Sequence, residues 1–148
     1  MKNLFLFMAI TLVGLGGCSE KRSQPLAIDN SLTQEEIAAG VLSPEVMWKM
    51  GRVGLASLSP DASRLLYTVT WYNMQENRGV TAIYVRDAAS GEVAQLTDFS
   101  SNNSDPKWNA DGSKIYFLSD LSGSSQIWEM AADGQNPRQL SKLDKDIE

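Results

Sequence analysis

Two stretches of the chain follow the same plan, and their spacing limits what the chain can fold into. Residues 58–70 read LSPDASRLLYTVT, and residues 108–120, fifty positions later, read WNADGSKIYFLSD. Each begins with an apolar residue, continues through a short polar turn and a basic residue, and ends in a run of apolar and aromatic residues. Such a match at a fixed spacing indicates two copies of one structural unit.

Each copy contains about four short segments rich in β-branched and aromatic residues, separated by turn residues. The predicted strands are 54–58, 65–70, 82–86 and 94–97 in the first copy, and in the second a strand ending at Trp108, then 115–118, 126–130 and 138–141. A period of about 40–50 residues with four strands per unit is typical of a β-propeller blade. The fold class is therefore predicted as all-β, with about two four-stranded antiparallel blades of an incomplete propeller in residues 53–148.

The second halves of the copies are offset by only forty-four residues, as from Tyr84 to Trp128. We assign the difference to a longer loop at 71–79 in the first copy, because loops absorb length changes between repeats. Aromatic residues recur at matching positions, Tyr67 with Phe117 and Tyr84 with Trp128. We expect them to fill the wedge between neighbouring blades.

The turn that opens each unit contains one informative difference. Asp111-Gly112 places glycine where a hairpin turn needs a positive φ, and the first copy has Ala62 at the same place. An alanine in that conformation costs about 1 kcal/mol, so either the turns differ or the first one is strained.

Composition excludes several classes of function. The chain has 148 residues, a net charge of −5 and no histidine. Its acidity and the absence of a Lys/Arg-rich run argue against nucleic acid as a partner. Without histidine, Ser-His-Asp catalysis and imidazole metal sites cannot form within these residues. Its Asp and Asn residues stand singly in turns, so we predict no catalytic, metal-binding or cofactor-binding residues and no cofactor.

The N-terminus has the features of an export signal. Lys2 precedes an apolar run, Leu4–Leu15, which is too short to span a membrane but typical of a secretory signal. The sequence Leu-Gly-Gly-Cys that ends at Cys18 resembles the lipobox of bacterial lipoproteins. This resemblance implies cleavage of a signal peptide 1–17 and attachment of lipid to Cys18, which would anchor the chain in the membrane. A plain signal peptide with a chance cysteine is the alternative.

The residue after the lipobox cysteine bears on location. Ser19, rather than aspartate, is typical of outer-membrane sorting in enteric-type bacteria. We therefore expect an exported protein in the cell envelope, at the outer membrane and facing the periplasm or the surface.

A tether and a leader are expected before the first blade. Residues 18–30 are polar and aperiodic, as in a flexible linker. Residues 31–52 contain two helix starts: Thr33 with Glu36 in capping-box spacing, and Ser43 followed by Pro44. They predict one or two short helices that pack against the propeller.

Residues 43–54 (SPEVMWKMGRVG), together with 59–61 (SPD) and 67–69 (YTV), resemble the opening of exported peptidases of the prolyl oligopeptidase family. The dipeptidyl-aminopeptidase and acylaminoacyl-peptidase type is the most similar. The resemblance implies an N-terminal propeller that admits peptides to a C-terminal α/β-hydrolase domain, a serine peptidase that acts in proteolysis.

No catalytic residue of that family can be placed here, because the chain has no Gly-x-Ser-x-Gly elbow. The chain stops where a third blade is expected, which predicts the N-terminal piece of a longer protein, truncated before its catalytic domain. Its expected partners are peptide substrates, through that missing domain, and the membrane. The alternative is a non-enzymatic Tol-type propeller of the envelope that binds a protein or a glycan.

Overall fold

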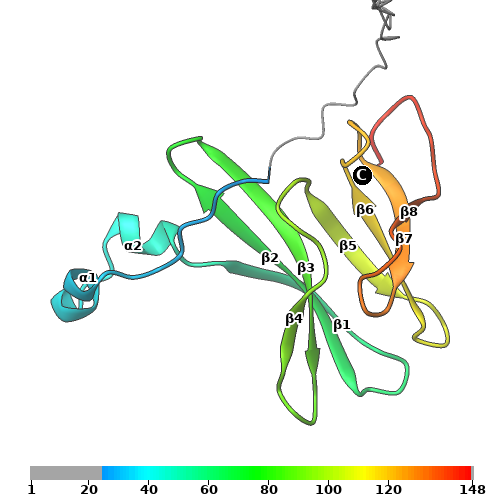
Figure 1. Ribbon diagram of the computed structural model, residues 1–148, viewed down its shortest axis with the longest axis horizontal. Coiled ribbons are helices and arrows are strands. Elements are labelled where there is room, and N and C mark those ends of the chain that lie inside the picture. Colours follow the sequence, from blue (N-terminus) through cyan, green and yellow to red (C-terminus); the bar gives the residue numbers. More distant parts are fainter. Residues whose placement is uncertain (1–24, 148) are drawn as a thin grey trace, which may run out of the picture.

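The chain forms two antiparallel sheets that lie side by side, preceded by two short helices (Figure 1). The computed structural model describes residues 25–147. The first sheet consists of β1 (Arg52–Leu58), β2 (Arg64–Asn73), β3 (Arg78–Asp87) and β4 (Val93–Gln95). The second sheet consists of β5 (Asn103–Trp108), β6 (Lys114–Ser119), β7 (Gln126–Ala131) and β8 (Arg138–Gln139).

Both sheets are four-stranded, and in each one the order of strands in space follows the sequence. Every neighbouring pair is antiparallel. This meander, repeated once, confirms the predicted all-β class, and every predicted strand has a counterpart in the structure.

The expectation of a long loop at 71–79 is wrong. β2 continues to Asn73 and β3 begins at Arg78, and their pairing extends from Arg64 with Asp87 to Asn73 with Arg78. The first copy is therefore longer because its central hairpin is longer: β2 and β3 have ten residues each, against six each in β6 and β7. Trp71 and Tyr72 favour a strand, and this preference outweighs the polar residues that follow them.

The main apolar core lies between the two sheets. The buried residues are Leu66 and Ile83 from the first sheet and Ile115, Phe117 and Met130 from the second. Leu96, Trp108 and Trp128 pack against this cluster and are partly buried. The sheets thus bury one face each against the other, as stacked repeats do.

The predicted aromatic wedge is confirmed on one side only. Phe117 is buried between the sheets and Trp128 borders the same cluster. Tyr67 and Tyr84 stack on each other, with ring centroids 5.8 Å apart. They lie on the opposite face of the first sheet, because side chains alternate along a strand and Leu66 and Ile83 point to the core.

The two equivalent turns have the same backbone conformation. Ala62 has a φ of 57° and Gly112 a φ of 72°, and each donates its N–H to the carbonyl three residues earlier. Of the two explanations for alanine at this place, the structure supports strain in the first turn.

The helices α1 (Gln34–Ala39) and α2 (Pro44–Trp48) begin where the sequence indicates. The Thr33 hydroxyl accepts from the Glu36 N–H at 3.2 Å, and the Glu36 carboxylate accepts from the Thr33 N–H at 2.8 Å, a complete capping box. Ser43 caps α2, with Pro44 at its first turn. Figure 1 shows both helices on the side of the first sheet away from the second.

Candidate functional site

The predicted lipid-attachment residue, Cys18, lies outside the described residues. Between residues 25 and 147 there is no group of three or more His, Cys, Asp or Glu side chains placed to hold a metal ion. No helix in the same range has the length and apolarity to cross a bilayer. The candidate sites are therefore the surfaces and cavities that the leader and the two sheets form.

One of these is a cleft between the leader and the extended hairpin of β2 and β3. Its volume is about 530 Å³. Its lining residues are Ala27, Ile28, Asp29, Pro44, Glu45, Trp48, Lys49, Tyr72, Asn73, Met74 and Gln75. The hairpin extension that distinguishes the first sheet from the second supplies one wall, so the cleft has no counterpart in the second unit.

Aromatic and cationic side chains hold the leader against the hairpin. Trp48 and Tyr72 meet edge to face, with ring centroids 5.2 Å apart. The Arg52 guanidinium lies over both rings, 4.6 Å from the Trp48 centroid and 4.4 Å from that of Tyr72. Asn73 donates from Nδ2 to the Ala27 carbonyl at 2.8 Å. These contacts fix the position of α2 on the first sheet.

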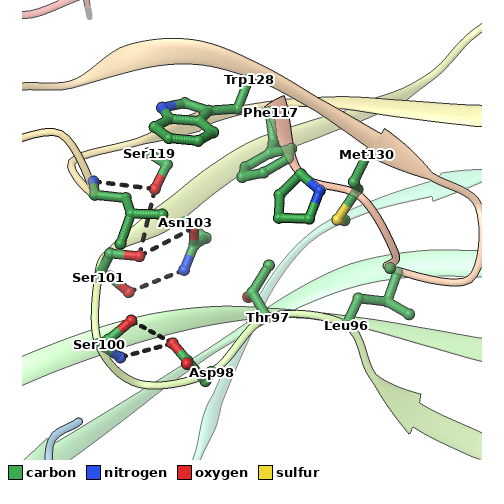
Figure 2. A pocket seen from close by; sticks show the side chains of 13 residues that line it. Leu96, Thr97, Asp98, Ser100, Ser101, Asn103, Phe117, Ser119, Trp128 and Met130 are labelled. Atoms are coloured by element: carbon green, nitrogen blue, oxygen red, sulfur yellow. Dashed lines mark hydrogen bonds between the residues drawn. The ribbon is translucent and has the colours of Figure 1, made fainter. Parts of the chain in front are cut away.

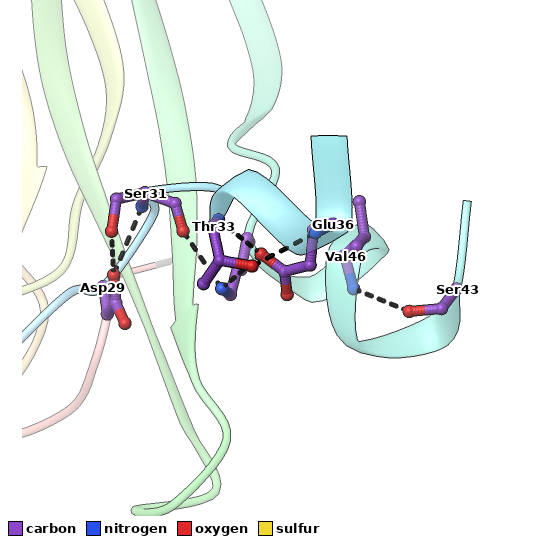
Figure 3. A network of polar contacts seen from close by, with 7 residues as sticks. Asp29, Ser31, Thr33, Glu36, Ser43 and Val46 are labelled. Atoms are coloured by element: carbon purple, nitrogen blue, oxygen red, sulfur yellow. Dashed lines mark hydrogen bonds and ion pairs between the residues drawn. The ribbon is translucent and has the colours of Figure 1, made fainter. Parts of the chain in front are cut away.

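Two of the charged groups that line the cleft, Lys49 and Asp29, have polar partners within the leader (Figure 3). Lys49 donates from Nζ to the Glu36 carboxylate and to the Ser31 carbonyl, both at 3.0 Å. The Thr33 backbone N–H and then Lys49 lower the pKa of Glu36, because both stabilise its ionised form. The hydroxyl and then the backbone N–H of Ser31 lower the pKa of Asp29 in the same way. This pairing suits a docking surface better than a centre for proton transfer.

A smaller cavity of about 150 Å³ lies between the two sheets (Figure 2). A polar network forms part of its wall: Ser119 donates to the Ser101 hydroxyl at 3.3 Å, and Asn103 donates to the Ser101 carbonyl at 2.9 Å. Trp128 also lines the cavity, and its buried indole N–H has no hydrogen-bond partner. The volume and the polar wall suit ordered water.

The sequence indicated the helices of the leader but not the cleft. The only signal was the aromatic residue Trp48 beside a helix start, since the second wall, at Tyr72, falls in a segment predicted as a loop. Serine, threonine and asparagine residues near 97–103 gave no sign of the network between the sheets, because such residues are equally common in exposed turns.

Comparison with known proteins agrees with this architecture. Residues 32–147 match the family described as the TolB beta propeller domain. Dipeptidyl-peptidase 5 of Porphyromonas gingivalis is 33% identical over 126 residues, which is 85% of this chain and 17% of the relative. Dipeptidyl-peptidase 5 of Porphyromonas endodontalis is 31% identical over 116 residues, 78% of this chain and 17% of the relative. The chain therefore spans about a sixth of the length of these curated relatives.

A solved structure supports the fold independently. The acylaminoacyl peptidase of Pyrococcus horikoshii superposes with a TM-score of 0.55 at 18% identity, over 66% of this chain and 15% of that one. The shared feature is the arrangement of four-stranded antiparallel sheets around which the described residues are built. Strand order, repeat and sequence match together identify the chain as a member of the TolB β-propeller domain family, related to the N-terminal propellers of prolyl oligopeptidase-type peptidases.

Proposed function

We propose that this chain is the N-terminal propeller region of an exported, lipid-anchored serine peptidase of the prolyl oligopeptidase family. In this proposal the propeller restricts access to an α/β-hydrolase domain, so that peptides rather than folded proteins reach the nucleophile. The serine nucleophile, its histidine base and the oxyanion hole belong to that domain and not to these residues.

The observation that carries the proposal is the extent of the similarity to dipeptidyl-peptidase 5. A match of 126 residues in a chain of 148 leaves out 22, so it has to include residues 23–126, and with them both leader helices, the first sheet, and β5 and β6. A match to repeated strand patterns alone would support any propeller. A match through the leader, whose contacts with the β2–β3 hairpin are specific to the first unit, favours the peptidase relatives.

The test is peptidase activity of the full-length gene product. We expect hydrolysis of chromogenic dipeptide or acyl-aminoacyl substrates that is abolished by a serine-directed inhibitor. The 148-residue chain, purified in the same way, serves as the control and is expected to show no hydrolysis. A folded full-length protein without turnover on either substrate class would contradict the proposal.

The lipid anchor is a separate part of the proposal and supports location in the envelope. We expect metabolic labelling with a fatty acid to mark the unaltered protein but not a Cys18→Ser variant, and the variant to leave the membrane fraction. Equal labelling of a Ser19→Ala variant is the matched control. A protein that remains unlabelled contradicts the lipid anchor without affecting the peptidase assignment.

The second candidate is a non-enzymatic envelope propeller that binds a protein or glycan partner. The description of the matched family as a TolB propeller domain favours it. The cleft between the leader and the β2–β3 hairpin, with Trp48 and Tyr72 in its walls, would serve as the docking surface in such a role. Further blades without a hydrolase domain downstream in the gene would support this candidate.

A further inference from the structure

The cleft between the leader and the β2–β3 hairpin is preformed, because the leader that makes one of its walls is fixed to the rest of the molecule. Leu26 is buried and donates its N–H to the Phe99 carbonyl at 2.9 Å. A Cβ at Gly51 would lie 2.6 Å from Val69 and 2.8 Å from Trp71, so the chain that follows α2 lies directly on the first sheet. A preformed cleft loses little conformational entropy when a ligand binds.

Aromatic surface is accessible inside this cleft. Trp48 and Tyr72 line it, and each residue is only partly buried. The Arg52 guanidinium lies over both rings, but Arg52 does not line the cleft, so part of each ring stays accessible from it. Met74, in the β2–β3 turn close to Tyr72, adds a lining residue that is 54% exposed. Aromatic and thioether surface of this kind binds apolar side chains.

The charged residues that line the cleft leave it with a net negative charge. They are Asp29, Glu45 and Lys49, and Lys49 forms an ion pair with Glu36, which lies outside the lining, at 3.0 Å. The backbone N–H of Glu45 and then the Ser43 hydroxyl lower the pKa of the Glu45 carboxyl, so this group is ionised at neutral pH. Neither Glu45 nor Asp29 forms an ion pair with another described residue. A basic ligand would therefore complement the cleft.

Size and hydrogen-bonding groups narrow the class of that ligand. A volume of about 530 Å³ is in the range of sites for ligands of moderate size. Phosphates and nucleic acids are disfavoured by the two carboxylates. The side-chain amide of Gln75, which also lines the cleft, can both donate to and accept from a peptide backbone. A peptide with basic and aromatic side chains at neighbouring positions matches the carboxylates, the accessible rings and the amide together.

We propose that this cleft binds peptide segments in which basic side chains flank an aromatic or large aliphatic one. The basic side chains pair with Asp29 and Glu45, and the apolar side chain packs against Trp48 and Tyr72. The inference goes beyond both candidate functions, because binding in the cleft involves no hydrolysis and uses residues of the leader and the first sheet alone.

The test measures binding of the capped peptide acetyl-Gly-Lys-Phe-Lys-Gly-amide to the full-length gene product by isothermal titration calorimetry, with a serine-directed inhibitor present so that the peptide is not hydrolysed. We expect binding that weakens as salt is added, because the carboxylates are exposed and therefore screened. Glu45→Gln and Asp29→Asn are each expected to weaken it roughly threefold, and the double variant more. Glu35→Gln is the matched control: it removes the same charge from an exposed residue of α1 outside the cleft and should leave the affinity unchanged.

Substitutions of opposite charge at Met74 separate an electrostatic effect from a structural one. Met74 is exposed in the β2–β3 turn and lines the cleft, so both variants are expected to fold like the unaltered protein. Met74→Glu should tighten binding of the peptide and Met74→Lys should weaken it, whereas damage to the cleft would weaken it in both. A peptide with photoreactive benzoylphenylalanine in place of phenylalanine locates the site: we expect cross-links to residues 27–29, 44–49 or 72–75.

Altered probes test each part of the recognition. Glutamate in place of both lysines, or glycine in place of phenylalanine, should weaken binding strongly, and the neutral sugar cellotriose should not compete. Equal binding of either altered peptide, competition by the sugar, cross-links elsewhere, or equal affinities of Glu45→Gln and Glu35→Gln would overturn the inference. Hydrolysis of chromogenic substrates by a protein that does not bind this peptide overturns the inference alone, whereas binding without any hydrolysis contradicts the proposed peptidase alone.

Discussion

At the scale of single residues, the repeat acts as an internal control, because the same backbone position carries different side chains in the two units. Ala62 and Gly112 share a left-handed conformation. Glycine adopts this conformation freely, whereas an L-residue brings its Cβ close to the following carbonyl. The first turn therefore keeps a conformation that its sequence does not favour, which is expected where the surrounding hairpin determines the backbone.

Ala62→Gly is expected to stabilise the chain by about 1 kcal/mol, because it removes this strain. The opposite substitution, Gly112→Ala, is expected to destabilise by more than that, since its Cβ would also lie 3.2 Å from Pro60. Chemical denaturation measures both. Ala110→Gly, which tests glycine outside a left-handed position, is the control and should lower stability slightly. A destabilised Ala62→Gly variant would contradict the strain.

The turn that contains Ala62 also contains Asp61, whose pKa is shifted more than that of any other acid among the described residues. The Ser59 hydroxyl, the Ser63 backbone N–H and the Ser63 hydroxyl, in that order, lower the pKa of Asp61 from 3.8 to about 2. The ionised form is stabilised in the folded chain, so this contribution to stability is present above the ordinary pKa and is lost as the pH falls through about 2.

We therefore expect Asp61→Asn to lower stability at pH 6 and to have a smaller effect near pH 2. Denaturation at both pH values measures the difference, and titration of the Asp61 carboxyl carbon by NMR gives the pKa directly. Ser59→Ala should move that titration upward. A carboxyl that titrates at its ordinary value would show that the serine contacts are absent in solution.

At the scale of elements, each strand of a sheet has the same role in both units, but its burial depends on what lies next to the sheet. β3 and β7 occupy the same place in their sheets, yet Ile83 is covered and Ile127 is not. Burial of an apolar side chain stabilises folding roughly in proportion to the area removed from water. Equivalent substitutions should thus have unequal effects.

Ile83→Ala is expected to cost about 2–5 kcal/mol, as truncation in a packed interior does. Ile127→Ala should cost below about 1 kcal/mol, because Ile127 is already 37% exposed. Thermal or chemical denaturation of the pair gives the comparison. Equal costs would mean that the two faces are equally covered, contrary to the arrangement of the sheets described above.

The sequence predicted the elements that local side-chain patterns determine, but not those that depend on contacts between distant segments. Strand positions and the helix starts at Thr33 and Ser43 follow from side-chain patterns that act locally, so they were predictable. The extension of β2 and β3 was not, because the mostly polar residues from Asn73 to Asn77 are typical of a loop, although Trp71 and Tyr72 favour a strand. The cleft at Trp48 and Tyr72 joins segments far apart in sequence, and no local pattern indicates such a contact.

At the scale of the whole molecule, the two sheets depend on one shared core. Phe117 from the second sheet packs in the same cluster as Leu66 and Ile83 from the first. In stacked repeats, stability is the sum of contributions within each unit and at the interfaces between units. The first sheet also buries Val69, Val80 and Ala82 outside this cluster, whereas the buried apolar residues of the second sheet, Ile115, Phe117 and Met130, all belong to it.

Phe117→Ala is therefore expected to lower amide protection in β6 and β7 most, and in β2 and β3 as well, because Leu66 and Ile83 pack in the same cluster. Hydrogen exchange measured by NMR or mass spectrometry gives the protection of each strand. Phe117→Leu, which keeps most of the apolar volume, should have a much smaller effect on both sheets. Loss of protection confined to the second sheet would show that the sheets open independently.

The long β2–β3 hairpin has one more consequence, for the direction in which the repeats are ordered. Tandem units of similar sequence can exchange places, so that an end segment settles on the wrong unit. Of the two sheets, the first alone presents Tyr72 and Asn73 on an extended hairpin, and the leader makes its contacts there through Trp48, Arg52 and Ala27. Of the two sheets, only the first therefore offers the N-terminal segment these contacts. This disfavours packing of the segment on the second sheet and so helps to fix the order in which the units pack.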